Sequence, residues 1–119
     1  MTSAGGYRSV LVVDDDKDIV DTLCDVLELR GWNTFRAFDA ESAVSLVMSS
    51  AVDWVLMDVR MPRMSGIEAL EVIRRGRPGQ RVVLMTAFAT SAVRDEAERA
   101  DVPLLKKPFD PAALLALLD

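Results

Sequence analysis

Histidine is absent from the sequence of 119 residues, and cysteine occurs once. Without histidine the chain cannot build a Ser-His-Asp triad, a Cys-His pair or a histidine metal site. The one cysteine, Cys24, has no partner for an internal disulfide, and its place in an apolar helical pattern predicts a buried thiol. Any phosphohistidine chemistry must therefore involve a second molecule.

The sequence is also poor in positive charge and has no long apolar run. With 14 Lys and Arg against 19 Asp and Glu, the net charge is −5. This balance argues against direct binding of nucleic acid, because phosphate contacts need a basic face. No apolar run reaches the roughly 20 residues that span a bilayer, and residues 1–6 lack the basic and apolar regions of a signal peptide. We expect a cytoplasmic protein that does not enter a membrane.

Short β-branched runs alternate with amphipathic helical patterns along the whole chain. The runs predict five strands, at Val10–Val13, Trp32–Ala37, Trp54–Met57, Val82–Met85 and Leu104–Leu105. Continuously apolar strands are typical of parallel sheets that are covered on both faces. The pattern therefore predicts one α/β domain over residues 1–119, a doubly wound five-stranded parallel sheet with helices on both faces.

Capping residues predict where several of the helices begin. Asp16 and Asp39 are placed as N-caps, and Ser65-Gly66-Ile67-Glu68 has the pattern of a capping box. Asp110 and Pro111 supply an N-cap and a first-turn proline for the last helix. These assignments rest on local sequence alone.

Ionisable or hydroxyl side chains follow four of the five strands. They are Asp14 and Asp15 after the first strand, Asp58 after the third, Thr86 after the fourth, and Lys106 and Lys107 after the fifth. Each one alone has an ordinary structural explanation, such as a solvated lysine or a threonine that ends a strand. Ligands of open α/β sheets bind beyond the carboxyl ends of the strands, so these groups are expected at one site.

The residue types at this edge suit phosphoryl transfer. Neighbouring carboxylates repel one another unless a cation relieves them, and a hard divalent ion such as Mg²⁺ prefers oxygen ligands. A carboxylate nucleophile can form an acyl phosphate, while a metal ion, a lysine and a hydroxyl stabilise the phosphoryl oxygens. The carboxylates, the lysine and the hydroxyl together therefore indicate a phosphoryl-transfer site more strongly than any one of them does alone.

Five short strings along the chain resemble the receiver domains of two-component response regulators. They are Val12-Val13-Asp14-Asp15-Asp16, Met57-Asp58-Val59-Arg60-Met61-Pro62, Met64-Ser65-Gly66, Met85-Thr86-Ala87 and Lys107-Pro108-Phe109. The resemblance covers nearly the whole chain, in order and at closely matching spacing. It implies a flavodoxin-like fold with strand order 2-1-3-4-5.

The resemblance also implies a role for each residue of the edge. It makes Asp58 the phosphoacceptor, Thr86 the switch hydroxyl, and Lys107 rather than Lys106 the phosphate-binding lysine. The metal ligands that it implies for Mg²⁺ are Asp14, Asp15, Asp58 and the backbone carbonyl of Arg60, with Asp15 the direct ligand of the acidic pair.

A chain of this family is a signalling switch and not an enzyme, although it assists its own phosphorylation and dephosphorylation. The resemblance implies a phosphohistidine donor, which is a histidine kinase or a phosphotransfer protein. It also implies that the last helix contributes to a homodimer or to the docking of an output domain. The four leucines of that helix, Leu114, Leu115, Leu117 and Leu118, are not expected all to face the core, which predicts an exposed apolar surface.

Two departures from the family bear on signal output. The family usually has an aromatic side chain three residues before the lysine, where this chain has Leu104. The stretch from Thr86 to Lys107 is also about one residue short. Phe88 stands two residues after Thr86, a position from which the family tunes the access of water to the acyl phosphate.

Three other functions share features with a phosphorylated receiver. A pseudo-receiver is an interaction module that is not phosphorylated, but here no acceptor, acid or lysine is lost. An enzyme of the haloacid dehalogenase type carries its nucleophile at the end of the first strand, whereas Asp58 ends the third and is followed by Val59-Arg60. A nucleotide-binding protein would have a glycine-rich loop after the first strand, and none is present.

Overall fold

The computed structural model describes residues 8–118. The expectation that residues 1–6 are not a signal peptide, and the two ends of the predicted domain 1–119, lie outside the described residues. The strands are β1 (Ser9–Val13), β2 (Asn33–Ala37), β3 (Trp54–Asp58), β4 (Arg81–Thr86) and β5 (Leu104–Lys106). The helices are α1 (Lys17–Leu29), α2 (Ala40–Ser49), α3 (Gly66–Gly76), α4 (Ser91–Arg99) and α5 (Pro111–Leu118). All strand pairs are parallel, in the order β2-β1-β3-β4-β5, which confirms the predicted flavodoxin-like fold.

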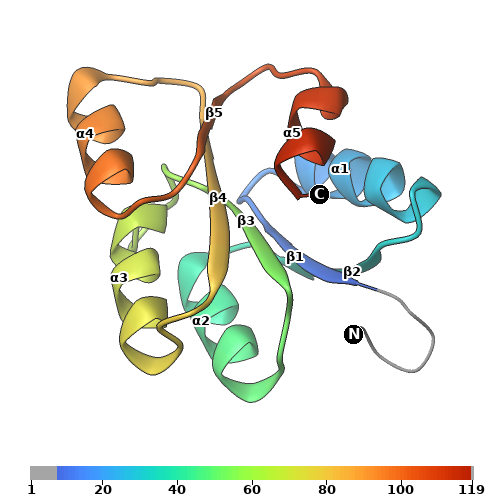
Figure 1. The fold of residues 1–119 in the computed structure, drawn as a ribbon, viewed down its shortest axis with the longest axis horizontal. Helices are drawn as coiled ribbons and strands as arrows, with labels where there is room; N and C mark the ends of the chain where they lie inside the picture. Colours follow the sequence, from blue (N-terminus) through green and yellow to red (C-terminus); the bar gives the residue numbers. More distant parts are fainter. Residues whose placement is uncertain (1–7, 119) are drawn as a thin grey trace.

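Helices cover both faces of the sheet. Helices α2, α3 and α4 lie on one side of it, and α1 and α5 lie on the other (Figure 1). The alternation along β1 divides its side chains between two cores: Leu11 and Val13 face the first layer, and Val10 and Val12 face the second. Both faces of the strand are buried, which is why its sequence is continuously apolar. Within residues 8–118, no helix combines the length and the apolar character that crossing a bilayer requires.

The strand register brings the carboxyl ends of the central strands into one row. Val13 is paired with Met57, and Asp58, the next residue along, is paired with Met85. Thr86 is paired with Lys106 at the end of β5. The polar residues that follow or end β1, β3, β4 and β5 are therefore neighbours in space.

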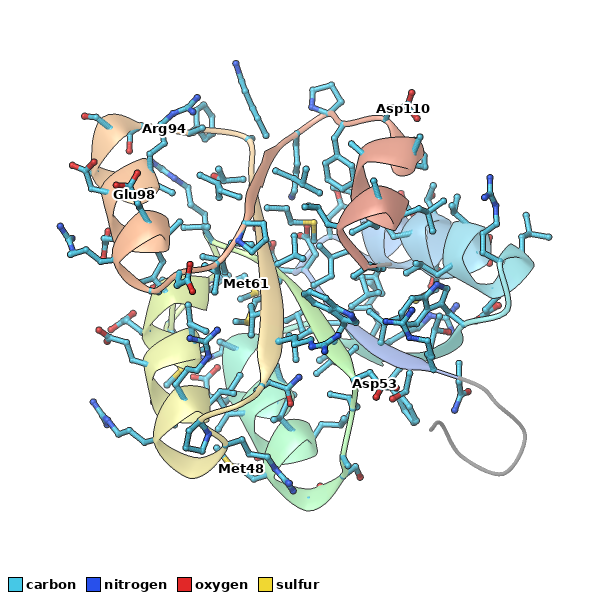
Figure 2. The ribbon with its side chains drawn as sticks, viewed as in Figure 1. Met48, Asp53, Met61, Arg94, Glu98 and Asp110 are labelled. Atoms are coloured by element: carbon cyan, nitrogen blue, oxygen red, sulfur yellow. The ribbon has the colours of Figure 1, made fainter. Side chains whose placement is uncertain are left out.

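The predicted N-caps form as expected. Asp16 accepts hydrogen bonds from the backbone N–H groups of Asp18 at 3.0 Å and Ile19 at 3.4 Å. The reciprocal bonds between Ser65 and Glu68 complete the capping box of α3. At the start of α5, the side chain of Asp110 accepts from the N–H of Ala112 at 2.9 Å (Figure 2).

The expectation for the leucines of α5 was wrong. Leu114, Leu115 and Leu118 are buried, and Leu117 is half-buried against the same core. At 3.6 residues per turn these four positions span about 160° of the helix circumference, which one broad core contact covers. The exposed positions of α5 carry only the small side chains Pro111, Ala112, Ala113 and Ala116.

Candidate functional site

Three carboxylates meet at the carboxyl edge of the sheet. Asp14 and Asp58 are almost fully buried, with 1% and 5% of their surface exposed, whereas Asp15 is exposed. One oxygen from each of the three lies within 4.8 Å of the others. The strand ends place the acids: Asp14 directly follows β1, where its N–H donates to the carbonyl of Ala37 at 3.3 Å, and Asp58 ends β3.

Lys107 joins the two buried carboxylates. Its Nζ lies 2.6 Å from Oδ2 of Asp14 and 3.0 Å from Oδ1 of Asp58. Lys106 is exposed and lines a hollow beside α4 instead. The structure therefore brings together Asp14, Asp15, Asp58 and Lys107, and it leaves Lys106 outside the site.

The site holds Asp58 in an unfavourable environment for a charged carboxylate. Burial, followed by the charge of Asp14, raises the pKa of Asp58 from 3.8 to about 6. The nearby Lys107 offsets only part of this rise. Burial lowers the pKa of Lys107, but its hydrogen bonds to Asp14 and Asp58 outweigh that effect, so the pKa is raised and the lysine is positively charged.

The hydroxyl of Thr86 lies at the end of β4 but is turned toward its own loop. Its Oγ1 accepts a hydrogen bond from the N–H of Phe88 at 3.1 Å and lies 3.4 Å from the carbonyl oxygen of Phe88, to which it donates. Thr86 is fully buried, so bulk water does not reach this hydroxyl. The backbone carbonyl of Thr86 accepts from the N–H of Lys107 at 2.8 Å, which ties β4 to the lysine.

Arg60 lies two residues beyond Asp58, on the loop between β3 and α3, and its side chain is exposed. The guanidinium is stacked over the ring of Phe88, with Cζ 5.0 Å from the ring centroid. Its backbone carbonyl as a metal ligand remains a prediction. The sequence placed Arg60 and Phe88 near the site but did not predict their contact, because a pairing between two loops has no local signal.

Gly66 lets the β3–α3 loop return close to Asp58. Its N–H donates to the carbonyl of Val59 at 2.9 Å, and a Cβ added at Gly66 would lie 2.2 Å from the backbone oxygen of Asp58. No side chain other than hydrogen fits there. The Met64-Ser65-Gly66 string pointed to this glycine, but the reason for it appears only in three dimensions.

An apolar groove that the sequence did not predict lies beside Lys107. It is a hollow of about 530 Å³ between α1 and the segment that joins β5 to α5. Its apolar lining includes Ile19, Leu23, Val26, Pro108 and Phe109. Because Lys107 also lines it, this apolar surface adjoins the lysine that contacts Asp14 and Asp58.

The donor set of the edge suits a small hard cation. Three carboxylates converge within 4.8 Å, and the one that is exposed, Asp15, gives access from solvent. Oxygen-only ligands favour Mg²⁺ or Ca²⁺ over the metals that prefer nitrogen or sulfur. The residues therefore fit a divalent ion placed beside Asp58.

Comparison with known proteins agrees with this geometry. Residues 10–119 match the model of the response regulator receiver domain. The chain is 37% identical over 102 residues to the regulatory protein AtoC of Escherichia coli, an alignment that covers 85% of this chain and 22% of AtoC. It also matches 47% of the length of the transcriptional regulatory protein CpxR of E. coli, so it spans less than half of either relative.

Solved structures share the whole fold. A CheY-like receiver domain protein from Methanospirillum hungatei superimposes with a TM-score of 0.90 at 27% identity, covering 94% of this chain and 90% of that one. A response regulator protein from Burkholderia pseudomallei, solved with a phosphorylated aspartic acid, a calcium ion and citrate, has a TM-score of 0.86 at 25% identity. That match covers 94% of this chain and 66% of the other.

Proposed function

The chain belongs to the response regulator receiver domains, and we propose that it is a switch operated by phosphorylation of Asp58. Residues 1–119 then form one receiver domain of a signalling protein. The observation that carries this proposal is the contact between Lys107 and Asp58 at 3.0 Å beside the acidic pair. It combines a nucleophile, a phosphate-binding cation and metal ligands in one site.

In the proposed reaction an oxygen of Asp58 attacks the phosphorus of a phosphohistidine. The new O–P bond forms as the N–P bond breaks, and the electron pair of that bond returns to the donor imidazole. The carboxylate must be ionised to attack, and a pKa of about 6 leaves it mostly ionised above neutral pH. Lys107 neutralises a phosphoryl oxygen. The hydroxyl of Thr86, which ends the strand next to β3, bonds another after it turns away from Phe88.

We propose Mg²⁺ as the resident ion, held by Asp14, Asp15, Asp58 and the backbone carbonyl of Arg60. When bound, the ion supplies positive charge that offsets the crowded carboxylates and the phosphoryl group. The Burkholderia response regulator was solved with a calcium ion as well as a phosphorylated aspartic acid, which supports a divalent cation in a protein of this family. Because Asp14 and Asp58 are buried, water does little to stabilise their negative charges, and a nearby positive ion is needed to offset them.

The partner that we propose as donor is a histidine kinase or a phosphotransfer protein. These 119 residues contain no histidine, so the donor imidazole must come from outside them. The apolar groove between α1 and the β5–α5 segment lies beside Lys107 and offers such a protein a docking surface next to Asp58. For a homodimer or output domain that docks on α5, we propose contact through the exposed side chains of Ala112, Ala113 and Ala116, because the leucines are buried or half-buried.

Phosphate uptake from acetyl phosphate tests the assignment. The domain is incubated with acetyl phosphate and Mg²⁺, and its intact mass is measured. We expect a single phosphate adduct that is absent from Asp58→Ala and present in the control Asp25→Ala, since Asp25 is exposed on α1 away from the site. An adduct that persists in Asp58→Ala contradicts the assignment, and no adduct in the parent protein favours the unphosphorylated interaction module.

A further inference from the structure

Phe88 is an exposed aromatic ring on the loop that joins β4 to α4. Its surface is 60% exposed, and among residues 8–118 only two other large apolar side chains, Leu29 and Phe38, are exposed. The ring is not isolated, because the guanidinium of Arg60 lies over it at 5.0 Å. This contact joins two loops, since Arg60 belongs to the segment that follows Asp58 and Phe88 to the segment that follows Thr86.

The backbone of Phe88 is tied to the hydroxyl of Thr86. The Phe88 N–H donates to Oγ1 at 3.1 Å, and the hydroxyl hydrogen points to the Phe88 carbonyl at 3.4 Å. A hydroxyl has one hydrogen, so it cannot donate to this carbonyl and to a new acceptor at the same time. Because Thr86 is fully buried, it cannot replace these partners with bulk water.

The same carbonyl leads on to α4. The N–H of Thr90 donates to the Phe88 carbonyl at 2.9 Å, and the side chain of Thr90 caps α4 by accepting from the N–H of Val93 at 3.3 Å. The helix itself buries a single residue, Ala97. A helix with so little buried surface is held largely by its end contacts. One of these is the bond from Nε of Arg94 to the carbonyl of Ala89 at 3.0 Å, with Arg94 in the part of α4 nearest that loop (Figure 2).

We propose that Arg60 and Phe88 form a latch between the β3–α3 and β4–α4 loops, which is closed while Asp58 is unmodified and opens when Asp58 is phosphorylated. The proposal rests on the proposed function of Asp58. It adds Phe88 as the aromatic side chain that transmits the event to α4, and it gives the Arg60 side chain a role separate from that of its carbonyl.

Phosphorylation acts on both halves of the latch. The phosphoryl group adds acceptor oxygens on Asp58. When the Thr86 side chain rotates about χ1 to bring its hydroxyl to one of them, Oγ1 moves away from the Phe88 N–H, which loses its acceptor. The guanidinium of Arg60, two residues from Asp58, is at the same time attracted by the added negative charge. A ring that has lost its backbone tether and its cation is free to leave its position, and the Thr90 cap follows through the shared carbonyl.

Amide and side-chain NMR on the isolated domain, with beryllofluoride and Mg²⁺ as the phosphoryl mimic, tests the latch. Two signals report on it: the hydrogen-exchange rate of the Phe88 amide, and the ring-current shift that Phe88 imposes on the δ-protons of Arg60. In the parent protein we expect the mimic to speed Phe88 exchange about fivefold, which corresponds to the loss of one typical net hydrogen bond. The Arg60 δ-protons should at the same time lose their upfield shift.

Two variants of Thr86 separate the tether from general damage to the fold. Thr86→Ser keeps the hydroxyl and should respond as the parent does. Thr86→Val keeps the volume without the hydroxyl, so the Phe88 amide should exchange rapidly with and without the mimic. The Phe88→Leu variant identifies the ring-current contribution, because the upfield shift of Arg60 should be absent from it in both states.

The outcomes distinguish the latch from the function on which it rests. Loading of the site is judged separately, from the amide shift of Val59 and from the phosphate adduct in intact mass. A loaded parent whose Phe88 exchange and Arg60 shift are unchanged overturns the latch and leaves the switch at Asp58 intact. A parent that does not load overturns both. Rapid Phe88 exchange in unloaded Thr86→Ser also contradicts the latch, because that variant retains the tether.

Discussion

Replacing the phosphoacceptor by its amide should stabilise the metal-free protein. The pKa of Asp58 rises from 3.8 to about 6 because the residue is buried and faces Asp14. The rise of about two pH units, at 1.36 kcal/mol per unit, means that the ionised carboxylate costs the folded state about 3 kcal/mol at neutral pH. Asp58→Asn removes this cost and leaves the contact between Lys107 and Asp14 in place.

The stability gained by Asp58→Asn should increase as the pH rises. The folded state holds the Asp58 proton more tightly than the unfolded state, so ionisation of Asp58 lowers the stability of the parent as pH rises from about 4 to about 7. We therefore expect Asp58→Asn to be more stable than the parent by about 3 kcal/mol at pH 7.5 and by roughly half of that at pH 5. In thermal melts at pH 7.5 this is a rise of about 10 °C.

Denaturant and thermal unfolding in the presence of a chelator measure the effect. Asp25→Asn is the matched control, because it removes one exposed carboxylate from α1 and should change stability by less than about 0.5 kcal/mol. Adding Mg²⁺ should reduce the difference in unfolding free energy between Asp58→Asn and the parent. The parent gains more from binding the ion than Asp58→Asn or Asp15→Asn does, because each variant lacks one metal ligand. The reasoning is refuted if Asp58→Asn is no more stable than Asp25→Asn at pH 7.5, or if its gain is the same at both pH values.

Four further variants test other parts of the structure. Gly66→Ala should lower stability by about 2–3 kcal/mol and impair phosphate uptake, because its Cβ would lie 2.2 Å from the backbone oxygen of Asp58; unfolding curves and intact mass check both. Phe88→Ala should change the lifetime of the phosphorylated form little, because the latch releases the ring when Asp58 is phosphorylated; a shortened lifetime in a dephosphorylation time course would mean that the ring stays in place and limits the access of water. Leu114→Ala should cost about 2–5 kcal/mol, since Leu114 is fully buried, whereas Ala113→Arg should keep the stability and remove any dimer that beryllofluoride induces in light scattering.

The sequence alone determined the fold and most of the site. Runs such as Val10–Val13 are apolar at every position because parallel strands between two helical layers are buried on both faces, and this pattern is local. The residues that end or follow the strands, among them Asp14, Asp58 and Thr86, could be placed at one edge because all parallel strands end on the same side of the sheet. The caps at Asp16 and Ser65 were predictable for the same reason, since each depends on a few adjacent residues.

The tertiary structure decided what depends on contacts between distant segments. The motif Lys107-Pro108 already favoured Lys107 over Lys106, but only the fold places its Nζ between Asp14 and Asp58, 93 residues from Asp14 in sequence. The Thr86 hydroxyl points toward Phe88 because of the side-chain rotamer that it adopts. The composition and periodicity of the sequence do not predict that rotamer. The leucines of α5 face the core because the surface formed by the sheet and α1 is wide enough to cover about half of the helix. The width of that surface depends on other segments, so the sequence of α5 alone does not predict it.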